Sequence, residues 1–141
     1  MELTISTVAK TEDKQYVRNK LIAYNYANFP AELKDMYEEV NLFVKDAAGQ
    51  TYGGLVGEIC WNWLEVHYLI VDENVRGQGY GKKLLMAAED IAREKGCDFI
   101  KLDTLSFQAI DFYKQQAYEV YGVIENAGGH THYYLKKNLL K

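Results

Sequence analysis

Three glycines at alternate positions, Gly77, Gly79 and Gly81, lie between a predicted strand and a predicted helix. Glycine lets the backbone turn tightly and keeps side chains away from a ligand. The first amides of a helix have no partners within the helix and lie at the positive end of its dipole, so such a turn binds anions. Arg76 and Lys82 can add positive charge at the rim. We therefore predict a phosphate-binding turn over residues 76–82.

Two common phosphate-binding patterns do not fit this turn. A nucleoside triphosphate loop would need glycine where Arg76 stands and serine or threonine where Lys83 stands. A dinucleotide fingerprint would need a third glycine at a spacing that Gly77, Gly79 and Gly81 do not provide, and it would lie earlier in a longer chain. A glycine-rich loop that holds no ligand is the other alternative.

The elements that position this turn follow from periodicity. Alternating apolar residues predict strands at 3–8, 40–44, 52–61, 63–71, 99–102, 119–125 and 132–139. Helical spacing predicts helices at 11–28, 31–37, 81–95 and 106–116, the first of them capped by Thr11. Gly53, Gly54 and Gly57 predict a bulge or a close backbone approach in their strand. The order predicts one domain over residues 1–141, a mixed sheet with helices on its faces.

Composition excludes several classes of protein. The 141 residues are 48% hydrophobic and 26% charged, with a net charge of -4, which is unlike disordered, fibrous or nucleic-acid-binding chains. The sequence has no apolar run of membrane-spanning length and no secretory signal, so we expect a cytoplasmic protein. Cys60 and Cys97 are expected to be buried free thiols. His130 and His132 lack an evident third ligand, so no metal is expected.

The stretch Arg76–Lys82 resembles the coenzyme A pyrophosphate signature of the GNAT-type N-acetyltransferases, with Arg76, Gly79 and Gly81 at its three specified positions. Ala109-Ile110-Asp111-Phe112-Tyr113 followed by Tyr118-Glu119-Val120 is similar to a second element of that family, in which a tyrosine faces the thioester sulfur. Ser106 and Ala117 stand where the family often has asparagine and glycine.

The resemblance implies an α+β fold with a twisted, mostly antiparallel sheet of six to seven strands and about four helices on its faces. It implies acetyl-CoA as co-substrate and no metal. The sheet would splay at strand 63–71 to admit the cofactor, whose pantetheine would pair with that strand's backbone. The residues implied to bind it are Leu69, Ile70, Val71, Arg76, Gly77, Gln78, Gly79, Tyr80, Gly81, Lys82 and Ser106.

Acetyl transfer to an amine requires loss of a proton from the ammonium and benefits from a proton donor at the leaving thiolate. The resemblance makes Tyr113 the general acid, since a phenol is protonated at neutral pH. Glu65 and His67 lie on one face of the strand that enters the turn, and either could be the general base. Histidine ordinarily titrates in the more suitable range.

The expected function is therefore transfer of an acetyl group from acetyl-CoA to a primary amine of a small molecule by direct attack. Acetylation of a protein or peptide amine, a non-catalytic acyl-CoA sensor and a nucleotide-binding module are the alternatives. Aromatic and acidic side chains between residues 24 and 63 suit a cationic acceptor. We expect no nucleic-acid or membrane partner, and the sequence is compatible with a homodimer.

Overall fold

The structure is a computed structural model that describes residues 1–139. Contacts divide the chain into two units, Met1–Asp35 and a second that begins at Met36. Each unit is described by itself. The expectation of one domain spanning residues 1–141 stays a prediction.

The first unit contains α1 (Thr11–Asn28) and the short 3-10 helix η1 (Ala31–Leu33). The predicted end of α1 is confirmed, and the Phe29 N–H donates to the Asn25 carbonyl at 3.1 Å. The predicted cap is wrong, because Lys10 occupies the N-cap position and Thr11 is the first helical residue. The predicted strand 3–8 is also wrong, since these residues form no ladder. Alternation marks a sequence that can be a strand, but a strand exists only where a neighbour supplies hydrogen bonds.

The second unit is built around a sheet in which the described residues form six strands. Their spatial order is β1-β2-β3-β4-β6-β5. All neighbours are antiparallel except β3 and β4, which are parallel. The predicted mixed, mostly antiparallel sheet is thus confirmed. The strands are β1 (Tyr37–Lys45), β2 (Thr51–Cys60), β3 (Trp63–Val71), β4 (Phe99–Leu105), β5 (Glu119–Ala127) and β6 (His130–Asn138).

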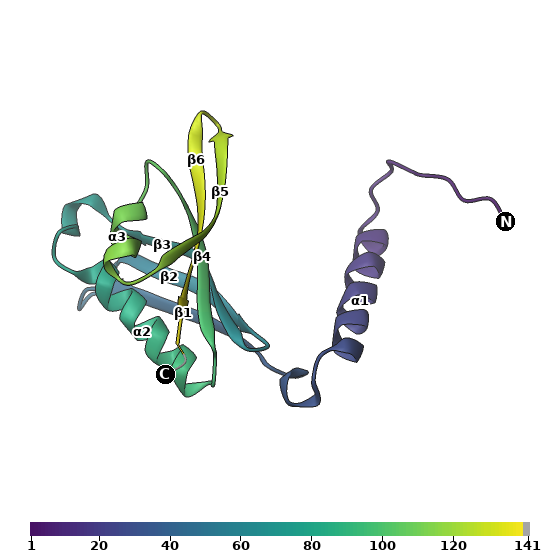
Figure 1. Cartoon of the computed structure of the whole chain (residues 1–141), viewed down its shortest axis with the longest axis horizontal. Coiled ribbons are helices and arrows are strands. Elements are labelled where there is room, and N and C mark those ends of the chain that lie inside the picture. The colour runs from purple at the N-terminus through teal and green to yellow at the C-terminus, as the bar shows by residue number, and fades with distance from the viewer. Residues whose placement is uncertain (140–141) are drawn as a thin grey trace. The chain divides into compact units, whose positions relative to one another are not determined.

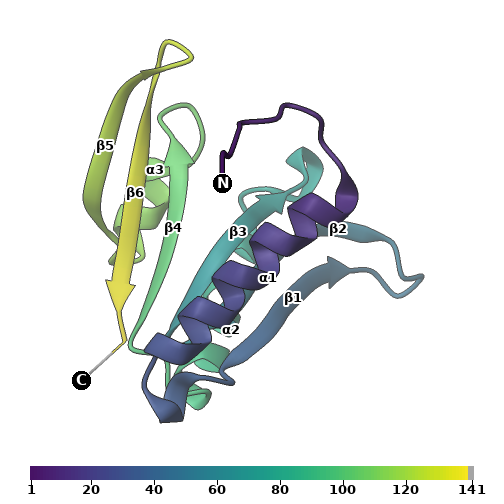
Figure 2. The same cartoon turned by 90° about the vertical axis from the view of Figure 1, so that its right-hand side faces the viewer.

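Helices α2 (Tyr80–Glu94) and α3 (Ile110–Gln115) lie on the same face of this sheet (Figures 1 and 2), and η2 (Glu73–Val75) is one further 3-10 turn. Among residues 1–139 there are three α-helices rather than about four. The predicted helix 106–116 is four residues too long at its start. There the Gln108 side chain accepts the Leu105 N–H at 2.7 Å, and the Thr104 hydroxyl accepts the Ala109 N–H at 3.4 Å. These side-chain bonds compete with the helix. None of the helices in the described part of the chain is long and apolar enough to span a membrane.

The core lies between α2 and the sheet. The apolar side of α2 buries its leucines and alanines, while most of its charged residues face outward. Each such leucine contributes about 1.5–3 kcal/mol when fully removed from water, so this packing fixes α2 and the turn that precedes it against the strands. The fully buried residues that meet there are Leu55, Ile59, Leu64, Leu85, Ala88, Ala92, Ile100 and Leu135.

Two irregularities open the sheet beside the core. The β2–β3 register shifts so that Val56 pairs with Tyr68 and Gly57 with Val66, which leaves His67 as an extra residue in β3. A Cβ on Gly57 would clash with the Glu65 carbonyl oxygen, so the close approach predicted for this glycine is present. Strands β3 and β4 pair only from Trp63–Phe99 to Glu65–Lys101. Beyond these pairs they diverge (Figure 2), which is the splay that the resemblance implies.

Candidate active site

The glycine-rich turn lies between β3 and α2 and has the conformation that its sequence predicts. Gly77 and Gly79 have φ angles of 78° and 84°, in the left-handed region that favours glycine. Gly79 is the N-cap of α2, and the first intrahelical bond runs from the Lys83 N–H to the Gly79 carbonyl. The amides just before Lys83 therefore lack intrahelical partners. Together with the dipole of this 15-residue helix they have the geometry that favours an anion.

Arg76 closes the loop that leads into the turn. Its Nε donates to the Val71 carbonyl at 2.8 Å, so the side chain returns to the end of β3. Arg76 and Lys82 both line the adjacent pocket and add positive charge to its wall. Arg76 and Lys82 thus provide the positive charge that the sequence predicts at the rim, and the side chain of Arg76 is also bound to the end of β3.

A pocket of about 1000 Å³ extends along the opening between β3 and β4. Its wall contains the end of β3, the glycine-rich turn, the end of β4 and the segment from Phe107 to Tyr113. All the predicted cofactor-binding residues lie on this wall except Gln78 and Ser106. The predicted residues that line the pocket are His67, Leu69, Ile70, Val71, Arg76, Gly77, Gly79, Tyr80, Gly81, Lys82 and Tyr113.

Tyr113, in α3, lies on the pocket wall and is only 5% exposed. Burial raises the pKa of its hydroxyl to about 12, with a further contribution from the negative charge of Asp103. Its ring makes edge contacts with Phe112 and Tyr118, at centroid distances of 5.2 and 5.9 Å. The phenol is therefore held in one place and stays protonated throughout the physiological range, as a proton donor must.

The two base candidates have different surroundings. His67, the extra residue of β3, lines the pocket, and its Nε2 lies 3.4 Å from Glu58 Oε1. Glu58 also accepts a hydrogen bond from the Tyr37 hydroxyl at 2.9 Å, so it is fixed on β2. Glu65 is not on the pocket wall, and its Oε1 lies 3.4 Å from Lys101 Nζ. The geometry favours His67 over Glu65.

Ser106 has a structural partner instead of a place on the pocket wall. Its N–H donates to the Thr131 carbonyl at 2.8 Å, and its Oγ accepts the Thr131 N–H at 3.1 Å. It thereby joins the end of β4 to the start of β6. Thr104 and Gln108 line the pocket near this point and bond to one another at 3.2 Å.

Sequence reasoning missed Asp103, Thr104 and Gln108. The buried apolar run predicts a strand that stops at residue 102, whereas β4 continues to Leu105. The pairing of Asp103 with Tyr134 and of Leu105 with His132 on β6 extends it. The sequence did contain a signal for Asp103 and Thr104. Both are polar residues at the end of the strand that follows α2, and polar residues at a strand end commonly line a ligand site.

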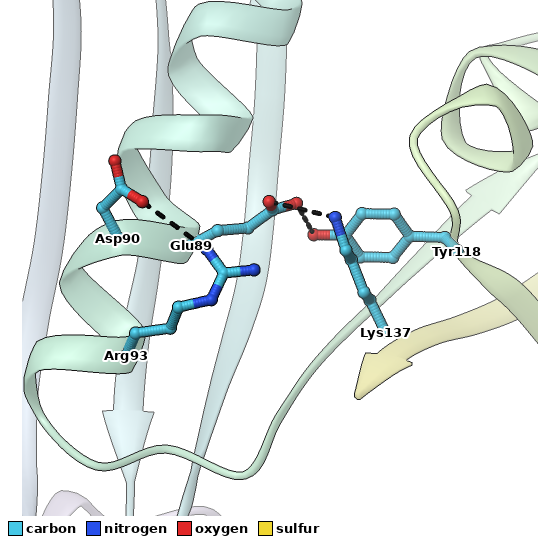
Figure 3. A network of polar contacts seen from close by, with 5 residues as sticks. All are labelled: Glu89, Asp90, Arg93, Tyr118 and Lys137. Atoms are coloured by element: carbon cyan, nitrogen blue, oxygen red, sulfur yellow. Dashed lines mark hydrogen bonds and ion pairs between the residues drawn. The ribbon is translucent and has the colours of Figure 1, made fainter. Parts of the chain in front are cut away.

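A buried polar network centred on Glu89 joins α2 to Tyr118 and to Lys137 of β6 (Figure 3). Glu89 of α2 is buried; its Oε2 accepts the Tyr118 hydroxyl at 2.9 Å, and its Oε1 lies 3.1 Å from Lys137 Nζ of β6. The Tyr118 N–H donates to the Tyr113 carbonyl at 3.0 Å. Burial, followed by the charge of Glu89, raises the pKa of Tyr118, so its hydroxyl remains a donor. The network therefore connects α2, which follows the glycine-rich turn, to Tyr113 in α3 through Tyr118.

The cysteines have no nucleophilic role in this arrangement. Cys97 is buried as expected, whereas Cys60 is only partly buried, and both are free thiols. Burial raises the pKa of each to about 11, with smaller contributions from Asp98 at Cys97 and from Glu58 at Cys60. Since the thiolate is the reactive form, both are unreactive at neutral pH.

Comparisons with known proteins identify the family of this chain. The sequence model of the acetyltransferase (GNAT) family matches residues 8–118. An acetyltransferase of Agrobacterium fabrum is 35% identical over 122 residues, 86% of this chain and 87% of that protein. The blasticidin-S acetyltransferase of Streptomyces morookaense is 44% identical over 73 residues, 51% of this chain and 54% of that protein. A crystal structure of an acetyltransferase from Bacillus cereus has a TM-score of 0.90 and 40% identity, over 96% of this chain and 97% of that one. The chain therefore belongs to the acetyltransferase (GNAT) family, and it is an acyltransferase.

Proposed function

We propose that this acetyltransferase transfers the acetyl group of acetyl-CoA to a primary amine of a small molecule by direct attack. One observation carries the proposal: a single pocket has both an anion-binding turn and a buried, protonated tyrosine on its wall. A thioester carrier with a pyrophosphate needs both features. The name of one relative, blasticidin-S acetyltransferase, supports a small-molecule acceptor.

The residues on the wall fit acetyl-CoA, which supplies the activated thioester. The amides from Gly77 to Lys82, with the Arg76 and Lys82 side chains, would hold the pyrophosphate. A pantetheine arm would lie along Leu69, Ile70 and Val71, where β3 has already separated from β4 and its backbone groups on that side are available to pair. Thr104 and Gln108 add polar groups on the facing wall.

The proton transfers follow from two side chains. The neutral imidazole of His67 accepts a proton from the substrate ammonium, which frees a lone pair on nitrogen. The amine nitrogen then forms a bond to the acetyl carbon, and the carbon–sulfur bond breaks. Tyr113 gives its proton to the departing thiolate and regains one from the nitrogen of the new amide. The proton on His67 leaves to solvent, so one proton is released per turnover.

The role of His67 predicts a specific pH dependence. A base must be unprotonated to work, so kcat rises with pH on the acid side of the profile. His67→Ala should lower kcat by about 100-fold and remove that acid limb. If Glu65→Gln instead lost the acid limb of the kcat profile and His67→Ala retained it, Glu65 would be the base.

A thermal-shift assay tests the cofactor proposal. Acetyl-CoA at 100 times its Kd would stabilise the folded state by about 2.7 kcal/mol, whereas ATP and NAD should have little effect. Two glycine variants form a matched pair, because Gly79 and Gly49 both have left-handed φ angles and no heavy atom within 4 Å of an added Cβ. Gly79→Ala and Gly49→Ala should lose similar stability, about 1–2 kcal/mol. Only Gly79→Ala should lose stabilisation by acetyl-CoA.

Thiol release with a panel of primary amines then tests the reaction. Turnover with small amines supports the proposal, and turnover only with a peptide N-terminus or lysine would replace it with protein acetylation. A large shift with acetyl-CoA but no thiol release with any acceptor would make the chain a sensor. A shift with ATP or NAD in place of acetyl-CoA would overturn the proposal.

A further inference from the structure

One carboxylate occupies a position on the pocket wall that neither cofactor binding nor proton transfer explains. Among the described residues that line the pocket, Asp103 is the single acidic side chain. The other charged groups there, Arg76 and Lys82, are cationic and come from the glycine-rich turn and the start of α2. A carboxylate would repel the phosphates and thiolate of coenzyme A, whereas it would attract a cationic group.

The position of Asp103 places it at the opening of the sheet. It is the fifth residue of β4, two residues beyond Lys101, where the pairing with β3 ends. On the other side β4 continues its ladder with β6, and Asp103 pairs with Tyr134. The Asp103 backbone is therefore fixed by one neighbouring strand, whereas the strand on its other side has moved away and leaves room for a ligand.

The Asp103 side chain is held from β6. His132 Nε2 lies 3.6 Å from Asp103 Oδ2, and the other ring nitrogen, Nδ1, is 3.3 Å from the Tyr134 hydroxyl. The His132 and Tyr134 rings pack with centroids 4.5 Å apart. These contacts engage one carboxylate oxygen, and the side chain is still 56% exposed. Oδ1 therefore has room to accept a hydrogen bond from a ligand.

The charge of Asp103 acts on Tyr113, the proposed proton donor of the pocket. The negative charge of Asp103 contributes to the raised pKa of Tyr113, which places the carboxylate within electrostatic reach of the phenol. His67 lines the same pocket from β3, across the opening. A group bound at Asp103 would therefore lie in the pocket whose wall carries both the proton donor and the proposed base.

We propose that Asp103, positioned by His132 and Tyr134, is the subsite that binds the ammonium group of the acceptor, and that the acceptor is accordingly a cationic amine. The inference rests on the proposed function and adds to it the residue that binds the substrate ammonium. The ammonium donates to Asp103 while His67 takes one of its protons. Asp103 thus acts as a binding and specificity residue, distinct from the base.

Steady-state kinetics of Asp103→Asn test the subsite, with spermidine and tyramine as acceptors. Asparagine keeps the size of the side chain and removes its charge. The KM for each amine should rise at least about tenfold, as expected for loss of a hydrogen bond to a charged group. The KM for acetyl-CoA and its thermal shift should change less than about twofold. Asp103→Glu should recover part of the amine affinity.

Asp98→Asn is the matched control. Asp98 immediately precedes β4, lies outside the pocket and accepts a hydrogen bond from Asn62 at 3.0 Å, which an asparagine oxygen can also accept. Its kinetic constants should equal those of the wild type. An unchanged amine KM in Asp103→Asn would overturn the subsite, and so would an equal rise in the KM for acetyl-CoA. Wild-type protein that binds acetyl-CoA but acetylates neither amine would instead count against the proposed function.

Discussion

Tyr113→Phe is expected to lower kcat by at least about 100-fold, the lower end of the range for loss of a general acid. The KM for acetyl-CoA should change less than about threefold, because the ring that lines the pocket is retained. Stability should change little, since the edge contacts with Phe112 and Tyr118 do not involve the hydroxyl. Thiol release against a saturating amine measures the effect, and thermal unfolding checks the fold.

The pH profile gives a second readout of the same residue. The hydroxyl of Tyr113 has a pKa raised to about 12, so the donor keeps its proton as the pH rises and no alkaline fall in kcat should come from it below about pH 11. Tyr52→Phe is a suitable control, because it removes a tyrosine hydroxyl outside the pocket, one that donates a hydrogen bond to Asp46 in the β1–β2 turn. Equal turnover of Tyr113→Phe and Tyr52→Phe would exclude Tyr113 as the acid.

Glu89→Ala is expected to have the largest effect on stability, lowering the free energy of unfolding by about 3–5 kcal/mol. Removing the carboxylate leaves the Lys137 ammonium, which is only 22% exposed, without its partner and leaves the Tyr118 hydroxyl without its acceptor. Glu89→Gln should lose less, because an amide oxygen can still accept from Tyr118. Urea unfolding followed by circular dichroism measures all of these differences.

The neighbouring Asp90 provides the control for Glu89. Figure 3 shows both carboxylates on α2, with Asp90 paired to Arg93. This pair is solvent-exposed, with Arg93 Nη1 3.5 Å from Asp90 Oδ1 and a 75% exposed Asp90 side chain. Exposed pairs contribute little, so Asp90→Ala should change stability by less than about 1 kcal/mol. If Glu89→Ala were no more destabilising than Asp90→Ala, the buried network would have no structural role.

The features that sequence reasoning recovered are those whose signal is local. The spacing of Gly77, Gly79 and Gly81 specifies left-handed and side-chain-free backbone within a few residues. The stripe of Leu84, Ala88 and Ala92 specifies which side of α2 is buried. Each property depends on neighbours in the chain and on helical periodicity. The anion site could therefore be predicted from seven residues and the helix that follows them.

Partners that are distant in sequence could not be predicted in this way. The bonds of Glu89 to Tyr118 and Lys137 span 29 and 48 residues, and no local pattern distinguishes Glu89 from the outward-facing Asp90. The predicted strand 3–8 fails for a related reason, since alternation cannot show whether a ladder partner is present. Asp103 lies on the pocket wall because pairing with β6 extends β4 beyond residue 102. Helix α3 begins late because the side chains of Gln108 and Thr104 bind the backbone N–H groups that precede it.

By itself the sequence determined the fold class, the left-handed conformation of the glycine-rich turn and the position of the helix that follows it, because glycine conformation and helical spacing act over a few residues. Only the tertiary structure decided which candidates meet. In the structure His67 lies on the pocket wall, whereas Glu65 lies outside it and pairs with Lys101. Ser106 also lies outside the pocket, and the polar residues that line it at the end of β4 and beyond are Asp103, Thr104 and Gln108. The physical reason is that β3 and β4 separate after three residue pairs, and this divergence selects which side chains line the opening.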